Sequence, residues 1–145
     1  MPYKYQALFD EFELTDCPGT DVKEISIPAY RWSHDPINHP WNFLPNILYD
    51  RVRKKPVRVL EKKDIAGVCN ISFFIKEDVA REKLETIKKN LEKKHQKLVD
   101  FYTHLAFGQI EDTDGKATDV KNSHFGFYEY VDCNFFEKFN IIAEI

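Results

Sequence analysis

"VCNISFFIKEDVAREKLETIKKNLEKKHQKLVDFYTHL" (residues 68–105) decides the fold class, because it joins a strand pattern directly to a helix pattern. In residues 68–75 apolar and other residues alternate, which places four side chains on one face of an expected strand: Cys69, Ile71, Phe73 and Ile75. In residues 77–105 a leucine recurs at every seventh position, and no Pro or Gly interrupts the stretch. A strand followed by an amphipathic helix predicts an α+β fold.

The expected helix, residues 77–105, is long for a chain of 145 residues. At a rise of 1.5 Å per residue it would measure about 43 Å, whereas the radius of gyration of such a domain is only ~15 Å. The helix must therefore span the molecule, break near Asn90, or project towards a partner. Its leucines favour packing against the protein's own sheet, because Lys94 occupies a seam position of the heptads. A homodimer through this helix is the alternative.

Alternating patterns on both sides of this stretch predict further strands. They fall in residues 3–9, 22–32, 56–60, 106–132 and 139–145, with a turn at 112–115 and a short helical turn at 46–52. Pro28 cannot donate a ladder hydrogen bond, so we expect the strand of residues 22–32 at a sheet edge. The sequence predicts one α+β domain over residues 1–145, with a mostly antiparallel sheet of six or seven strands packed on one long helix.

Composition narrows the possible classes of protein. Apolar residues make up 43% of the chain and aromatic residues 14%, which is enough for a packed core. The net charge of −3 provides no overall positive field for nucleic acid. Three widely spaced cysteines, and acids where a signal peptide needs apolar residues, predict a cytoplasmic protein with reduced thiols. No apolar run approaches the ~18 residues that a membrane span requires.

Residues 30–45, "YRWSHDPINHPWNFLP", hold both tryptophans and three of the seven prolines, and we call this segment the strap. The prolines at 36, 40 and 45 exclude regular structure from Ser33 to Pro45 and stiffen this part of the strap at low entropic cost. Several of its side chains belong to the types that concentrate binding energy at interfaces: Arg31, Trp32, Trp41, Asn42 and Phe43. They predict a surface that binds a partner protein. Alternatively, the tryptophans cover the open end of the sheet.

The strap also offers a weaker hypothesis, a metal site. His34, Asp35 and His39 are spaced so that they can reach one divalent ion, with His124 or Cys69 as a further ligand. Such a site predicts a small metal-dependent hydrolase or nuclease. Histidines beside prolines and tryptophans in loops more often stack or form local hydrogen bonds, and the tight spacing of established metal motifs is absent.

A third hypothesis is a nucleotide or single-stranded nucleic-acid binder, in which the strap's aromatic rings stack on bases. The lysines of residues 83–97 would contact phosphate, but glutamates interleave with them and nucleic acid is disfavoured as a partner. No P-loop or other phosphate-cradling glycine motif occurs. The sequence therefore favours a non-enzymatic intracellular interaction module of the accessory, adaptor or immunity type. It would need no cofactor and would bind through the strap or the long helix.

Overall fold

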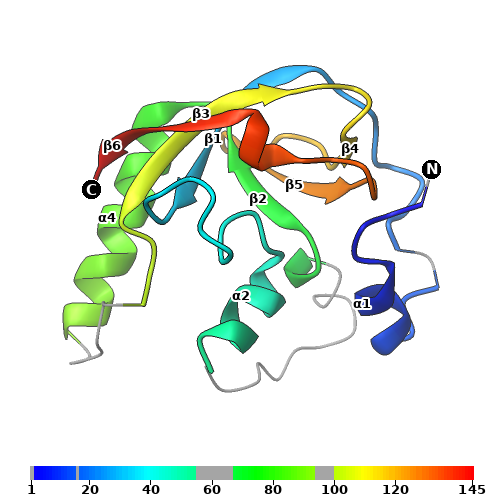
Figure 1. The fold of residues 1–145 in the computed structure, drawn as a ribbon, viewed down its shortest axis with the longest axis horizontal. Coiled ribbons are helices and arrows are strands. Elements are labelled where there is room, and N and C mark those ends of the chain that lie inside the picture. The colour runs from blue at the N-terminus through cyan, green and yellow to red at the C-terminus, as the bar shows by residue number, and fades with distance from the viewer. Residues whose placement is uncertain (1, 16, 55–66, 94–99) are drawn as a thin grey trace.

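The computed structural model describes residues 2–15, 17–54, 67–93 and 100–145. Six strands and three α-helices have bounds within these residues (Figure 1). The strands are β1 (Ile27–Ser33), β2 (Ile71–Phe74), β3 (His104–Ile110), β4 (Gly115–Ala117), β5 (His124–Glu129) and β6 (Phe139–Glu144). The helices are α1 (Gln6–Glu11), α2 (Asn46–Val52) and α4 (Glu77–Lys93), with a 3-10 turn, η1, at Phe135–Glu137. The predicted α+β class is confirmed.

All six strands form one antiparallel sheet in the order β4-β5-β2-β1-β3-β6. β1 pairs with β3 along its whole length, from Ile27 opposite Ile110 to Ser33 opposite His104. The ladder between β1 and β2, in contrast, consists of the single pair Tyr30 and Phe74. The sheet therefore opens between these two strands immediately beyond that pair. The predicted strand at residues 56–60 lies outside the described residues.

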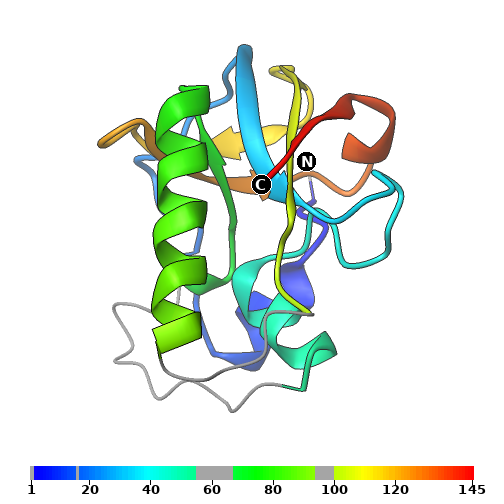
Figure 2. The ribbon, with the colours of Figure 1, turned by 90° about the vertical axis from the view of Figure 1, so that its left-hand side faces the viewer.

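Helix α4 packs on one face of the sheet, against β1 and β2 (Figure 2). Ala80 and Leu84 are fully buried on its inner side, which confirms that this helix covers the protein's own sheet. The predicted helix was too long: it begins at Glu77 as expected and is described to Lys93, but Leu105 belongs to β3. Leu105 is fully buried opposite Trp32. Burial in the sheet outweighs the heptad pattern at this residue.

No helix in the described part of the chain is long and apolar enough to cross a membrane.

The N-terminal strand predicted at residues 3–9 was wrong, because residues 6–11 form α1. The same sequence carries a second apolar spacing, i, i+3, i+4 and i+7, which is that of a helix: Tyr5, Leu8, Phe9 and Phe12. Leu8 and Phe9 are buried by α1, and the two other side chains pack beside them. The helical spacing places all four on one side, where two are buried and two are half-buried, and it prevails over the alternation.

The predicted edge position of β1 was also wrong, since β1 lies in the middle of the sheet. Pro28 is the second residue of β1, and the pairing with β2 begins only at Tyr30. On that side there is no ladder at Pro28 to interrupt, so a central strand tolerates the proline.

The face of the sheet opposite α4 carries an aromatic core. Five fully buried phenylalanines meet there: Phe73, Phe125, Phe127, Phe135 and Phe139. Phe43 of the strap packs into the same cluster, with ring centroids 5.2 Å from Phe139 and 5.5 Å from Phe135. The strap thus covers this core. Helix α2 follows the strap in the chain and confirms the short helix expected at residues 46–52.

Candidate functional site

Asn42 fixes the shape of the strap. Its side chain is buried, and its Oδ1 accepts a hydrogen bond from the backbone N–H of His34 at 2.8 Å. Its Nδ2 donates to the carbonyls of His34, Pro36 and Ile37 at 3.0, 3.2 and 3.0 Å. One amide therefore closes the loop across eight residues, which is a structural role rather than a surface contact.

The five residues predicted to bind a partner protein differ in how much of their surface is exposed. Arg31, Asn42 and Phe43 are at most 4% exposed. Trp32 and Trp41 are half-buried. Binding of a partner through the strap stays a prediction, and the two tryptophans are the members of the set that retain accessible surface.

The strap histidines are used in local contacts. The rings of His34 and His39 stack with centroids 4.8 Å apart. Nε2 of His34 lies 2.8 Å from the Tyr49 hydroxyl, and Nδ1 of His39 accepts the Trp41 N–H at 3.0 Å. The pKa of His34 is lowered to about 4, chiefly by burial and to a smaller extent by the nearby His39 and Arg53.

The metal hypothesis gains no support from this geometry. Asp35 is exposed, and His124 lies on β5 beside Phe74, with ring centroids 5.3 Å apart. Within the described ranges, no group of three or more His, Cys, Asp or Glu side chains comes together in a way that could hold a metal ion. The site made of His34, Asp35, His39 and His124 stays an untested prediction.

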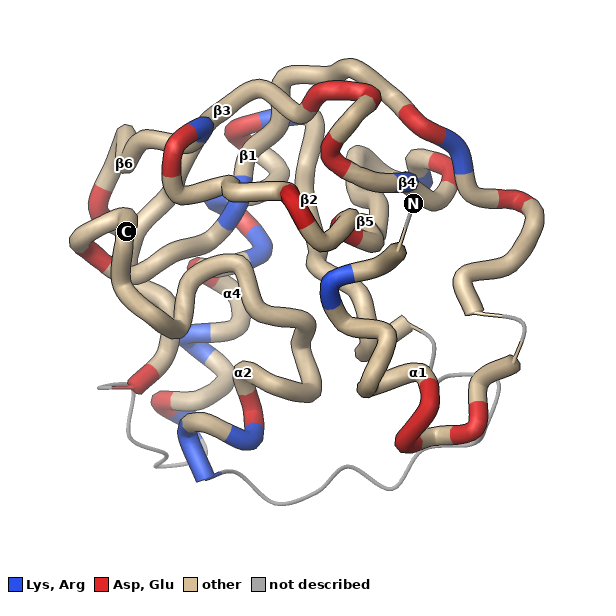
Figure 3. The backbone as a smooth tube through the Cα atoms, turned by 45° about the vertical axis from the view of Figure 1, so that its right-hand side comes forward, with Lys and Arg blue, Asp and Glu red and all other residues tan. Residues whose placement is uncertain are grey.

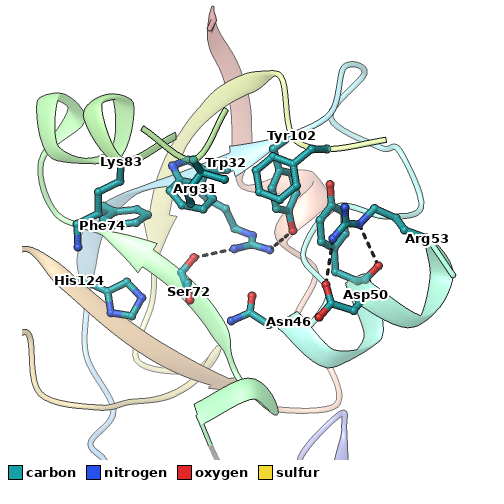
Figure 4. Close-up of a pocket in the computed structure, with 13 residues that line it drawn as sticks. Arg31, Trp32, Asn46, Asp50, Arg53, Ser72, Phe74, Lys83, Tyr102 and His124 are labelled. Atoms are coloured by element: carbon teal, nitrogen blue, oxygen red, sulfur yellow. Dashed lines mark hydrogen bonds and ion pairs between the residues drawn. The ribbon is translucent and has the colours of Figure 1, made fainter. Parts of the chain in front are cut away.

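A pocket of about 420 Å³ opens where β1 and β2 separate, between α2 and α4 (Figure 4). Basic side chains from four elements line it: Arg31, Arg53, Lys83 and His124. Aromatic side chains form much of the remaining wall: Trp32, Tyr49, Phe74, Phe101 and Tyr102. Asp50 is the one carboxylate among the described lining residues. Figure 3 shows basic residues on α2, α4 and β1, with acidic residues among them.

Arg31 reaches this pocket from β1 and occupies the opening in the sheet. Its Nη1 donates to the Ser72 carbonyl at 2.7 Å, which attaches it to β2 where the ladder has ended. Its Nη2 donates to the Tyr102 hydroxyl at 2.9 Å and to the Leu44 carbonyl at 3.3 Å. Its Nε has no acceptor among the described residues.

Arg31 makes no direct ion pair with a carboxylate in the part of the chain that is described, although at longer range its charge opposes the rise that burial causes in the pKa of Glu129. The ion pairs found there belong to other basic side chains: Lys4, Arg51, Arg53, Arg81 and Lys138. Arg31 is only 2% exposed. Burying an ion costs several kcal/mol unless an opposite charge and hydrogen bonds compensate for the lost water. An anion in the pocket would provide that opposite charge.

A column of stacked side chains holds Arg31 in place. The Arg53 guanidinium lies 4.0 Å from the centroid of the Tyr49 ring. Tyr49 and Tyr102 stack with centroids 4.1 Å apart and an angle of 7° between their planes. Arg31 follows, 5.5 Å from the Tyr102 centroid. Arg53 differs from Arg31 because it is paired with Asp50 at 3.0 Å.

Two further basic groups lie across the pocket from this column. Lys83 comes from α4, with its Nζ 5.7 Å from the Phe74 ring centroid. His124 is paired with Phe74 in the register of β2 and β5. Burial lowers the pKa of His124, and the positive charges of Lys83 and Arg31 lower it further. The pocket therefore has a positive potential that an anion would relieve.

Sequence reasoning singled out Arg31 and His124 but assigned them other roles. A signal for Arg31 was present: it shares the parity of Ile27 and Ala29, which predicts an inward-facing charge on β1. Tyr102 was missed because it fell inside the predicted helix. No family model, curated protein or solved structure matches this chain.

Proposed function

We propose that this chain is a non-enzymatic intracellular binding module, and that its ligand is a small anion or anionic group held in the Arg31 pocket. One observation carries the proposal: the buried Arg31 guanidinium makes no direct ion pair in the described structure, and its Nε, which is also buried, has no hydrogen-bond acceptor there. A guanidinium presents its donors in a planar fork that matches carboxylate and phosphate oxygens. Lys83 and His124 add charge and a donor from two other elements.

The walls of the pocket also suit binding. Ligand sites are typically concave, lined by aromatic side chains, and equipped with a few fixed polar groups. Here the Tyr49 and Tyr102 stack fixes the hydroxyl that positions Arg31. Because these side chains are already held in place without a ligand, binding would cost little entropy for ordering them.

A titration of the protein with acetate and phosphate at constant ionic strength, followed by proton-nitrogen NMR, tests the proposal. We expect saturable shifts of resonances around the pocket. Lys83→Met should weaken binding about two- to fivefold, as expected for an exposed charge pair. Lys89→Met removes the same charge from an exposed position of α4 outside the pocket and serves as the matched control. Equal effects of the two substitutions, or shifts without saturation, would count against the proposal.

Binding of a partner protein through the strap is the second candidate function. The observation in its favour is that Trp32, near the end of β1, and Trp41, on the following loop that Asn42 closes by hydrogen bonds, both stay half-exposed. Such aromatic anchors contribute strongly to interfaces when their loop is already ordered. If this candidate is correct, Trp41→Ala abolishes co-purification of one defined protein, whereas Val120→Ala, at an exposed position away from the strap, leaves it intact.

A further inference from the structure

A shallow groove of about 390 Å³ continues from the Arg31 pocket along α4. It is lined by Trp32, Val79, Glu82, Lys83, Thr86 and Ile87. Trp32, Lys83 and Ile87 line both the groove and the pocket, so the two hollows adjoin. Figure 4 shows Trp32 and Lys83 on the α4 side of the pocket, at this junction.

The indole N–H and the hydroxyl that line the groove are already satisfied. Nε1 of Trp32 donates to the Ala80 carbonyl at 2.8 Å, and the Thr86 hydroxyl donates to the Glu82 carbonyl at 2.9 Å. The groove follows α4 rather than a sheet edge, so it presents no row of free backbone groups to a peptide. What it presents is the indole of Trp32 and the side chains of Val79 and Ile87.

From this arrangement we propose that the ligand is an amphiphilic carboxylate with an unbranched alkyl chain. Its carboxylate binds Arg31, and its chain passes Trp32 and lies in the groove between Ile87 and Val79. The eight residue steps from Val79 to Ile87 correspond to about 12 Å along the helix axis. This inference rests on the proposed anion-binding function and deepens it by naming the class of ligand.

The charges at the junction favour this polarity of binding. Lys83 lines both hollows, whereas Glu82 lines the groove but not the pocket. A carboxylate is therefore attracted towards Arg31 and Lys83 and repelled by Glu82. An apolar chain gains by covering Trp32 and Ile87, because removing apolar surface from water is favourable in proportion to its area.

A chain-length series tests the inference, using acetate, butyrate, hexanoate, octanoate and decanoate below their micellar concentrations. The protein carries Trp41→Phe, so that the fluorescence of Trp32, the remaining tryptophan, reports binding. Each methylene that enters the groove should tighten binding about fourfold, and the gain should stop once the groove is filled. Decanol, which has the chain without the charge, should bind more weakly than decanoate.

Two substitutions separate the head group from the chain. Lys83→Met should weaken every carboxylate by a similar factor, whereas Val79→Thr should weaken decanoate and leave acetate unchanged. Val120→Thr, at an exposed position outside both hollows, is the matched control for the added hydroxyl.

The outcomes distinguish this inference from the proposed function on which it rests. Acetate binding without any effect of chain length overturns the amphiphile and leaves the anion-binding function standing. The absence of binding by every member of the series, and by phosphate, overturns both. A peptide with an apolar C-terminal residue that binds more tightly than decanoate would assign the site to a protein terminus and overturn the alkyl ligand.

Discussion

His34→Gln should change how the stability of the protein depends on pH. His34 is 9% exposed, and its Nε2 lies 2.8 Å from the Tyr49 hydroxyl. Burial lowers its pKa from 6.5 to about 4. In the unfolded chain the imidazole binds a proton below its ordinary pKa, whereas in the folded protein it does so only near pH 4. The free energy of unfolding must therefore fall as the pH decreases between these two values.

The size of this effect follows from the two pKa values. One unit corresponds to 1.36 kcal/mol, so the full shift of His34 is equivalent to about 3 kcal/mol, and about 2.5 kcal/mol of it is lost by pH 4.5. Burial also raises the pKa of Glu129, which acts in the opposite direction because the folded protein then retains a proton that the unfolded chain releases. The contribution of His34 must therefore be isolated by a comparison with His34→Gln, in which Glu129 is unchanged.

Urea unfolding of both proteins at pH 7.5 and pH 4.5 measures this difference. The glutamine amide can occupy the position of Nε2, so at pH 7.5 the substitution should cost only about 1 kcal/mol. Between pH 7.5 and pH 4.5 the wild-type protein should lose about 2.5 kcal/mol more stability than the variant. Identical pH dependence of the two proteins would refute the reasoning. So would an NMR titration in which the His34 imidazole takes up its proton near pH 6.5.

Three further predictions concern the pocket, the strap and the sheet-facing side of α4. Carboxylate affinity should rise as the pH falls towards the pKa of His124, because a bound anion favours the protonated imidazole. Titrations at several pH values measure this dependence, and His124→Gln should flatten it. The charged groups that line the same pocket are Arg31, Asp50, Arg53 and Lys83. Asn42→Ala should lower the free energy of unfolding in urea by about 3 kcal/mol, because it leaves buried carbonyls and an N–H without partners, whereas the exposed Asn38→Ala should change it little. Leu84→Ala should cost about 2–5 kcal/mol in the same assay and the half-buried Leu91→Ala clearly less; equal losses would contradict the packing of α4.

Local patterns in the sequence predicted much of the sheet but not the N-terminal helix. The alternation in residues 71–74 and 139–144 corresponds to β2 and β6, because one face of each strand packs on the core. Residues 5–12 carry both a two-residue and a helical spacing, and only the shape of the cluster that receives Leu8 and Phe9 decides between them. The heptad leucines misplaced the end of α4 for a similar reason. Leu105 satisfies the heptad, yet it is buried in β3.

The pocket could not be predicted from any one segment. It depends on the ladder between β1 and β2 ending after the pair Tyr30 and Phe74, which is a property of the twisted sheet and not of either strand. It also depends on Tyr102 leaving the predicted helix to stack on Tyr49, 53 residues earlier in the chain. The strap contributed the residue types that the sequence emphasised, but the fold turns Arg31 inward, towards Ser72 and Tyr102.

The most direct test of anion binding at Arg31 is the NMR signal of its own Nε–H. Arg31→Lys identifies the resonance by its disappearance, and the wild-type protein is then titrated with acetate and phosphate at constant ionic strength, with chloride as the balancing anion. Because Nε has no acceptor among the described residues, a bound carboxylate or phosphate should shift this resonance in a saturable way, while the ion-paired Arg53 changes less. An Arg31 Nε–H resonance that stays in place up to the highest anion concentration would contradict the account.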